Sequence, residues 1–152
     1  MSTHKQQRLT VKPEPHPSIA TQPFWEGCKK SQLLLPRCRT CRNVHFYPRL
    51  FCPSCGHAEF TWITASGRGH IRALTTVHRS FWGDAWANDL PYTVALITLE
   101  EGVQIVSNII DPPPHDIQCG AIQCGAPVTV TFENRGNYRL PVFQVAPTTP
   151  DR

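Results

Sequence analysis

Cys38-Arg39-Thr40-Cys41 and Cys52-Pro53-Ser54-Cys55 are the stretches that decide the fold of this chain. Each is a C-x-x-C knuckle, and ten residues separate the two. Two knuckles at this spacing can place four thiolate sulfurs around one tetrahedral ion. A set of four soft sulfur ligands favours zinc, with iron as the second choice. We therefore predict a metal-stabilised ribbon, and its expected ligands are Cys38, Cys41, Cys52 and Cys55.

This predicted site is structural, because four protein ligands leave no open position for a catalytic water. The alternative is a set of free thiols in a reducing compartment. His57 lies two residues after Cys55 and could replace one cysteine, although a complete set of four makes this exchange unnecessary. His45 lies in the segment that joins the knuckles, and we expect it to pack inside the ribbon.

The composition indicates one small, mainly β protein. The 152 residues include 15 prolines, which favour loops and strands over long helices. The formal charge of +4 fits a small anionic ligand at least as well as a nucleic-acid backbone. Seven cysteines do not suggest a secreted disulfide framework. No stretch approaches the roughly 20 apolar residues of a membrane span, and the N-terminus has no apolar signal region. We expect a soluble, cytoplasmic protein with no membrane partner.

Five segments follow from the pattern along the chain. They are a mobile tail over residues 1–22, a helix over 23–34, the zinc ribbon over 35–61, a barrel domain over 62–147 and a C-terminal tail over 148–152. Pro23 suits the first turn of the helix. Phe24 and Trp25 face either the core of this chain or another chain, and the sequence leaves both open.

From residue 60 onward the apolar residues recur with a period of two, which is typical of strands. In the first of these strands we expect Ile71, Ala73, Thr75 and Val77 on one face, with His70 and His78 exposed on the other. Further strands are expected over 92–99, 103–110, 128–133 and 142–145, with a tight turn at 100–102. Five short strands close most economically as an OB-type barrel, whereas a β-sandwich needs about seven.

A tandem repeat, IQCGA at 117–121 and again at 122–126, precedes the fourth strand. Its two cysteines, Cys119 and Cys124, could form a second metal half-site. No partner ligands accompany them, so we interpret the repeat as a lengthened loop.

The order of these pieces resembles the zinc-ribbon OB-fold proteins long labelled DUF35, which accompany thiolase-superfamily and other acyl-CoA enzymes. The similar segments cover most of residues 23–146, and they are PFWEG at 23–27, CRTC at 38–41, FCPSCG at 51–56, SGRGHI at 66–71, PYTVALITLEEG at 91–102 and GAPVTVTF at 125–132. Two features depart from the family. Arg42 stands where a glycine is common after the first knuckle, and the repeat lengthens the loop before Gly125.

The resemblance implies a mainly β fold: an N-terminal helix, a rubredoxin-like zinc ribbon and a five-stranded OB barrel. It also implies a non-catalytic subunit in a hetero-oligomer with a thiolase-like partner. The subunit would bind and help position the CoA part of an acyl-CoA for acyl transfer, Claisen or retro-Claisen/aldol chemistry. The residues agree, because no nucleophile–base set or pair of carboxylates indicates catalysis by this chain alone.

The loop from Ser80 to Leu90 is the best candidate for contact with CoA, because OB folds bind ligands with this loop. Its aromatic residues could stack on an adenine, or could fold back and cap the barrel. Nearby arginines could pair with phosphates. The candidate CoA-binding residues are Arg68, Arg72, Arg79, Phe81 and Trp82.

A single-stranded nucleic-acid module is the alternative function, since zinc ribbons and OB barrels with exposed aromatics also occur there. We do not expect nucleic acid as a partner, because the net charge is low. The basic residues also gather near the ribbon, at Arg37, Arg39, Arg42 and Arg49.

Overall fold

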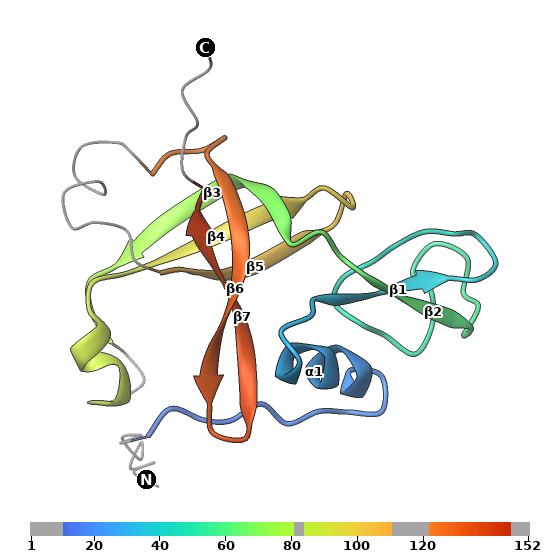
Figure 1. Ribbon diagram of the computed structural model, residues 1–152, viewed down its shortest axis with the longest axis horizontal. Helices are drawn as coiled ribbons and strands as arrows, with labels where there is room; N and C mark the ends of the chain where they lie inside the picture. Colours follow the sequence, from blue (N-terminus) through green and yellow to red (C-terminus); the bar gives the residue numbers. More distant parts are fainter. Residues whose placement is uncertain (1–10, 81–83, 111–121, 147–152) are drawn as a thin grey trace, which may run out of the picture.

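The computed structural model describes residues 11–80, 84–110 and 122–146 (Figure 1). The elements of this part of the chain are α1 (Gln22–Lys29), β1 (Leu34–Cys38), β2 (Phe60–Thr64), β3 (Arg68–Val77), the 3-10 helix η1 (Asp84–Asp89), β4 (Tyr92–Leu99), β5 (Gln104–Ile109), β6 (Pro127–Arg135) and β7 (Tyr138–Val145). The first repeat unit at 117–121, with Cys119, and the C-terminal tail at 148–152 lie outside the described residues. None of the helices described is long and apolar enough to cross a membrane.

The five strands after the ribbon close into one barrel in the order β3-β4-β5-β7-β6. Strand β3 pairs antiparallel with both β4 and β6, and β5 meets β7 in parallel at Ile109 and Phe143. This order is that of the OB fold. The expected fold class, a helix and zinc ribbon followed by a five-stranded barrel, is confirmed.

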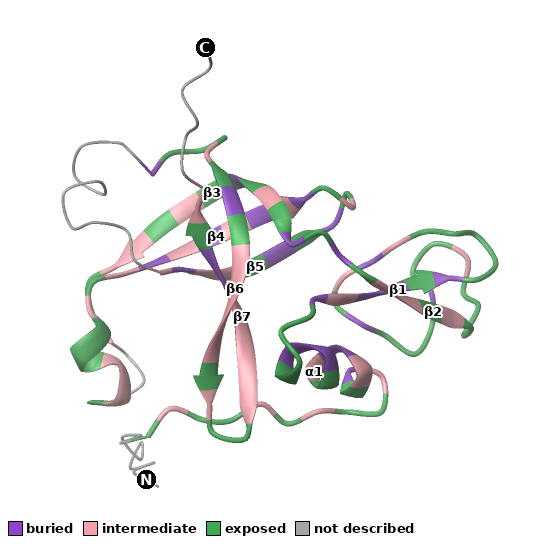
Figure 2. Cartoon of the chain, in the orientation of Figure 1, coloured by how far each residue is buried: buried purple, intermediate pink, exposed green. Residues whose placement is uncertain are grey.

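The interior of the barrel comes from strict alternation on β4. Thr93, Ala95, Ile97 and Leu99 are buried there, while the residues between them are half-buried. Figure 2 shows the buried positions running along the barrel strands and onto α1. Because side chains alternate across a strand, this one segment fixes which face of β4 closes the core.

Strand β3 departs from the expected alternation after Ile71. The pairing with β4 shifts between Ile71 and Ala73, so Arg72 is the extra residue of a β-bulge. Ile71 is buried, but Ala73 and Thr75 are exposed and Leu74 packs against the core instead. The expectation that Ala73, Thr75 and Val77 share the face of Ile71 is wrong, because one inserted residue moves every later side chain to the other face.

Two glycines allow the chain to enter the barrel between Ser66 and His70. Gly67 has a φ of +73°, and a Cβ there would lie 2.4 Å from Cγ1 of Val130. A Cβ on Gly69 would lie 2.4 Å from the carbonyl oxygen of Thr98 on β4. The G-x-G step is therefore a place of close backbone approach.

Helix α1 packs against both the ribbon, at β1, and the barrel, at β7 (Figure 1). The helix expected over residues 23–34 ends at Lys29, because the chain turns at Ser31 with a φ of 59° and β1 begins at Leu34. Phe24 is buried and meets the rings of Trp25 and Phe46 at centroid distances of 5.0 and 5.6 Å. Phe24 thus faces the core of its own chain.

The segment before the helix also packs on the barrel, although it was expected to be part of a mobile tail. The Glu14 carboxylate accepts hydrogen bonds from the backbone N and Nδ2 of Asn137, each at 3.3 Å. Asn137 lies in the turn between β6 and β7. Lys12 forms an ion pair with Asp89 of η1. Residues 11–21 therefore contact two parts of the barrel domain that are distant in sequence.

Candidate functional site

The four knuckle cysteines come together at one point of the ribbon. Their sulfur atoms all lie within 4.8 Å of one another. The Cys38 and Cys55 sulfurs are 3.5 Å apart, and those of Cys41 and Cys52 are 3.6 Å apart. A tetrahedral zinc with Zn–S bonds of about 2.3 Å requires sulfur separations of about 3.8 Å. The sulfur set thus fits one zinc ion.

Each knuckle closes through a tight turn of the backbone. Arg42 N donates to the carbonyl oxygen of Cys38 at 3.0 Å, and Gly56 N donates to that of Cys52 at 2.9 Å. Both donors have positive φ, +65° at Arg42 and +77° at Gly56. Arg42 therefore adopts the left-handed conformation that glycine adopts in the second knuckle, at a cost of about 1 kcal/mol. The replacement of glycine leaves the turn and its hydrogen bond intact.

Backbone N–H groups stabilise a thiolate at the first knuckle. The amides of Cys41 and Thr40 donate to the Cys38 sulfur, and the first of these is the larger cause that lowers the pKa of the Cys38 thiol to about 6. Burial of Cys38 opposes the shift. Donation of this kind prepares a sulfur for a cation, because it favours the charged form.

The two histidines of the ribbon stand outside the sulfur cluster. His57 Nδ1 lies 3.2 Å from the carbonyl oxygen of Cys55, so it is engaged with the backbone. His45 is buried, and neither ring nitrogen has a partner among the described residues. Its ring meets Phe60 edge-on at 5.2 Å, and burial lowers its pKa. His45 is a neutral packing residue, as expected.

The structure does not bring the candidate CoA-binding arginines to one point. Arg68 begins β3 and forms a two-pronged ion pair with Glu100, with Nε–Oε1 at 2.9 Å and Nη2–Oε2 at 3.0 Å. Arg72 is the bulge residue, and Arg79 follows the far end of β3. A ten-residue strand extends about 33 Å, so Arg68 and Arg79 cannot share one phosphate. Phe81 and Trp82 lie outside the described residues.

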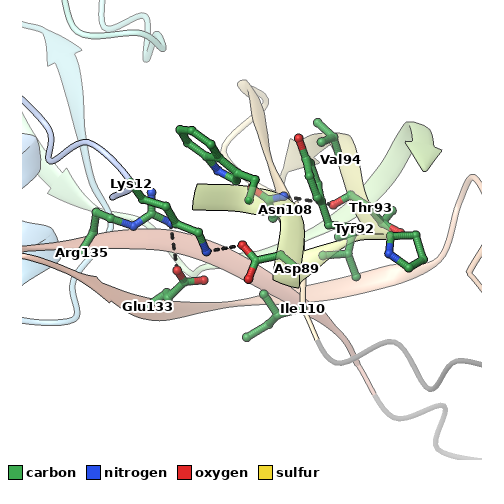
Figure 3. A pocket seen from close by; sticks show the side chains of 12 residues that line it. Lys12, Asp89, Tyr92, Thr93, Val94, Asn108, Ile110, Glu133 and Arg135 are labelled. Carbon is green, nitrogen blue, oxygen red and sulfur yellow. Dashed lines mark hydrogen bonds and ion pairs between the residues drawn. The ribbon is translucent and has the colours of Figure 1, made fainter. Parts of the chain in front are cut away.

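A pocket of about 570 Å³ opens beside the same loop (Figure 3). We call it the interloop pocket, because it lies between η1 of the β3–β4 loop and the β6–β7 hairpin, over β4 and β5. Its lining residues are Lys12, Trp86, Asp89, Pro91, Tyr92, Thr93, Val94, Asn108, Ile109, Ile110, Glu133 and Arg135. Trp86 and Asp89 belong to the loop from Ser80 to Leu90 that the sequence indicated as a ligand site. The other lining residues could not be predicted, because the lining comes from segments more than 100 residues apart.

The charges in the interloop pocket are balanced. Lys12 pairs with Asp89, and Arg135 Nη2 lies 3.0 Å from Glu133 Oε1, as the dashed lines of Figure 3 show. Thr93 contributes a hydroxyl that is buried and has no partner among the described residues. The pocket is therefore polar without a net charge.

A second hollow, of about 400 Å³, separates α1 and the ribbon from β5 and β7. We call it the apolar groove. Its lining contains no charged side chain and consists of Phe24, Trp25, Phe46, Tyr47, Gln104, Ile105, Val106, Ser107, Asn108, Leu140, Pro141 and Val142. Val106 is 66% exposed there and Tyr47 is also exposed. Leu50 and Phe51 follow on the same ribbon loop as Tyr47 and are exposed as well.

Two family descriptions match this chain in sequence. Residues 25–61 match the family described as "ChsH2, rubredoxin-like zinc ribbon domain", and residues 62–133 match "ChsH2, C-terminal OB-fold domain". A DUF35 domain-containing scaffold protein of Methanocaldococcus jannaschii is 35% identical over 98 residues, or 63% of this chain and 68% of that protein. A probable enoyl-CoA hydratase alpha subunit of Thermomonospora curvata is 31% identical over 135 residues, or 87% of this chain. The chain spans only 40% of the length of that hydratase subunit.

Solved structures give the same picture. The structure titled "Ltp2-ChsH2(DUF35) aldolase" contains a chain that superimposes with a TM-score of 0.75 at 27% identity, covering 87% of this chain and 98% of that one. A DUF35 protein of unknown function from Sulfolobus solfataricus superimposes with a TM-score of 0.59 at 14% identity, covering 84% of this chain and 86% of that one. The second likeness shows the fold alone.

Proposed function

The chain belongs to the DUF35 family of zinc-ribbon and OB-fold proteins, and on this premise we propose that it is a non-catalytic accessory subunit of an acyl-CoA-processing enzyme. Its relatives include scaffold proteins and a chain of an aldolase complex, which supports an accessory role. In this proposal it docks on a thiolase-superfamily subunit and helps to position the CoA part of the substrate. The partner carries out the acyl transfer or the C–C bond chemistry.

The observation that carries this proposal is the apolar surface of the ribbon and the apolar groove. Phe51 is 61% exposed, and Leu50 beside it is exposed as well. Single exposed apolar residues are ordinary, but a hollow without charged lining next to exposed aromatic residues is typical of the centre of a protein interface. A partner that supplies an apolar segment would fill this hollow.

The described residues offer no catalytic set, which agrees with an accessory role. His70 and His78 are exposed on β3 and just beyond its end, so neither lies in an enclosed site where a general base would act. Cys28 is buried, and burial raises the pKa of its thiol to about 12, so it is not an activated nucleophile.

We assign the zinc ion a structural role in this subunit. Cys38, Cys41, Cys52 and Cys55 would hold it. A zinc bound by four sulfurs supplies folding energy and has no open position for a substrate. The ion would fix the ribbon loop that carries Tyr47, Leu50 and Phe51, and so would shape one side of the proposed docking surface.

Reconstitution with a partner tests the proposal. The zinc-loaded full chain is purified with its associated subunits from native cells, and the partner's turnover of acyl-CoA is measured with and without the chain. We expect no turnover by the chain alone and a loss of turnover when it is withheld. Phe51→Ser and Val106→Ser should each weaken the complex about tenfold, as is usual for anchors at an interface centre.

Ile19→Ser is the matched control, because Ile19 is 88% exposed and lies outside both the apolar groove and the ribbon loop that carries Phe51. It should leave the complex intact. The proposal fails if the isolated chain turns over a thioester, or if the partner reaches full turnover without it. Equal weakening by all three variants would refute the assignment of the docking surface.

A further inference from the structure

We propose that the interloop pocket binds a neutral purine nucleoside group, with its phosphates held outside the pocket. The inference rests on the proposed function, in which that nucleoside is the adenosine end of CoA. It replaces the expected cradle of Arg68, Arg72 and Arg79 with a different set of residues.

The position of the pocket is the first argument. It lies over β4 and β5, which are the second and third strands of the barrel, between the β3–β4 loop and the β6–β7 hairpin (Figure 3). OB folds bind ligands on this face, between the corresponding loops. A volume of about 570 Å³ is within the range of small-ligand sites.

The aromatic residues of the lining suit a planar group. Trp86 and Tyr92 are both half-buried, so each keeps part of its ring accessible at the pocket. Stacking on such a ring stabilises any of the nucleic-acid bases, because every base has a flat π-face. A flexible aliphatic chain would gain less from these rings.

Thr93 is the second, independent observation that indicates a ligand. It is 1% exposed, it lines the pocket, and its Oγ1 has no hydrogen-bond partner among the described residues. A buried hydroxyl without a partner destabilises a protein unless something else satisfies it. The side-chain amide of Asn108 donates to the Thr93 carbonyl oxygen at 3.4 Å. This hydrogen bond is long and therefore weak, so the amide can also bond to a ligand. A base with ring nitrogens and an exocyclic amine can satisfy both groups.

The paired charges argue against phosphate inside the pocket. Each cation already has a carboxylate partner, Lys12 with Asp89 and Arg135 with Glu133. A phosphate that bound either cation would displace its partner and leave a carboxylate beside an anion. A neutral group meets no such cost, because the four charges sum to zero.

The N-terminal segment completes the wall of the pocket. Lys12 reaches Asp89 across the opening, and Glu14 holds the segment to the β6–β7 turn at Asn137. Deletion of residues 1–17 should therefore weaken nucleoside binding although it leaves every barrel strand in place.

Titration calorimetry of the zinc-loaded full chain tests the inference with five probes: CoA, 3′-dephospho-CoA, adenosine, pantetheine and inorganic diphosphate. We expect the two CoA forms to bind within about threefold of each other, adenosine to compete with CoA, and pantetheine to bind far more weakly. Inorganic diphosphate should not compete. Competition by diphosphate, or equal binding of pantetheine and CoA, would overturn the proposal.

Two substitutions locate the binding. Trp86→Ala should weaken CoA binding about tenfold or more, and Trp86→Phe should restore most of it. Thr93→Val should weaken CoA binding about fivefold yet raise the unfolding temperature of the free chain, because it removes an unsatisfied hydroxyl. Thr98→Val on the same strand, outside the pocket, is the control and should leave CoA binding unchanged. Unchanged CoA affinity in both Trp86→Ala and Thr93→Val overturns the inference.

These outcomes are separable from those of the proposed function. If both pocket variants keep full CoA affinity but the chain still supports its partner, the pocket assignment is wrong and the accessory role stands. If a single-stranded oligonucleotide displaces CoA with a steep dependence on salt, the ligand is nucleic acid and the inference is wrong.

Discussion

Substitution of Gly69 by alanine should destabilise the barrel through contact with backbone atoms that cannot move away. The new Cβ would lie 2.4 Å from the Thr98 carbonyl oxygen and 3.1 Å from Leu99 Cα, both on β4. An ordinary contact begins near 3.4 Å, so β3 and β4 must separate by about 1 Å where they pair. Overpacking of this kind costs about 1–3 kcal/mol, and we expect the upper end because the obstacle is a paired strand.

Two further alanine variants separate this steric cost from backbone strain. Gly102 has a φ of +81° and open space around it. Gly102→Ala should therefore lower the free energy of unfolding by only about 1 kcal/mol, which is the cost of the left-handed conformation for alanine. At Gly67 the obstacle is the Val130 side chain, so Val130→Ala should partly rescue Gly67→Ala. It should not rescue Gly69→Ala.

Urea unfolding of the zinc-loaded chain, followed by circular dichroism, measures all of these variants. Without a steric clash, Gly69→Ala would stabilise the chain by about 0.4–1 kcal/mol, because alanine restricts the unfolded state. The reasoning is therefore refuted if Gly69→Ala is as stable as the parent or more stable. It is also refuted if Gly102→Ala is the more damaging of the two, because conformation and not contact would then govern these positions.

Three other outcomes can be measured on the same protein. Chelation of zinc should remove hydrogen-exchange protection from the ribbon strands β1 and β2 before the barrel strands, and equal protection with and without metal would contradict a structural ion. His45 has a lowered pKa from burial, so the folded state binds its proton less readily than the unfolded state. Stability should therefore fall as the pH drops below about 6.5, and the fall should be smaller in His45→Phe, which unfolding curves between pH 7.5 and about 5.5 would show. Cys28 should resist iodoacetamide in the folded chain while exposed Cys124 reacts, and peptide mapping that found both labelled alike would show that Cys28 is accessible.

Much of the fold could be predicted from local patterns. The spacing of the cysteines predicts the ribbon, because a short loop between two knuckles leaves few ways to gather four sulfurs. The strand expected over 92–99 has those bounds in the structure, because alternating burial is visible in consecutive residues. The hairpin of β6 and β7 is longer than the strands expected over 128–133 and 142–145. The Gly136-Asn137 pair at its turn is a hairpin signal that we did not use.

The bulge at Arg72 could not be predicted in this way. Ile71, Ala73, Thr75 and Val77 recur with a period of two, and Leu74 is the one apolar residue out of phase with them. The shift itself becomes visible only when β3 pairs with β4. The same holds for the end of α1, since Leu33 and Leu34 continue an apolar pattern but belong to the turn and the first ribbon strand. In both places pairing between strands overrides the periodicity of a single segment.

The sequence by itself determined the sulfur cluster, the strand content and the resemblance to a family, because each depends on residues close together in the chain. The tertiary structure alone decided where a ligand can bind. Lys12, Asp89, Asn108 and Arg135 come from four segments, and only closure of the barrel places them around one pocket. It also decided that Arg68 pairs with Glu100, since Coulomb attraction acts over distance in space and not along the chain.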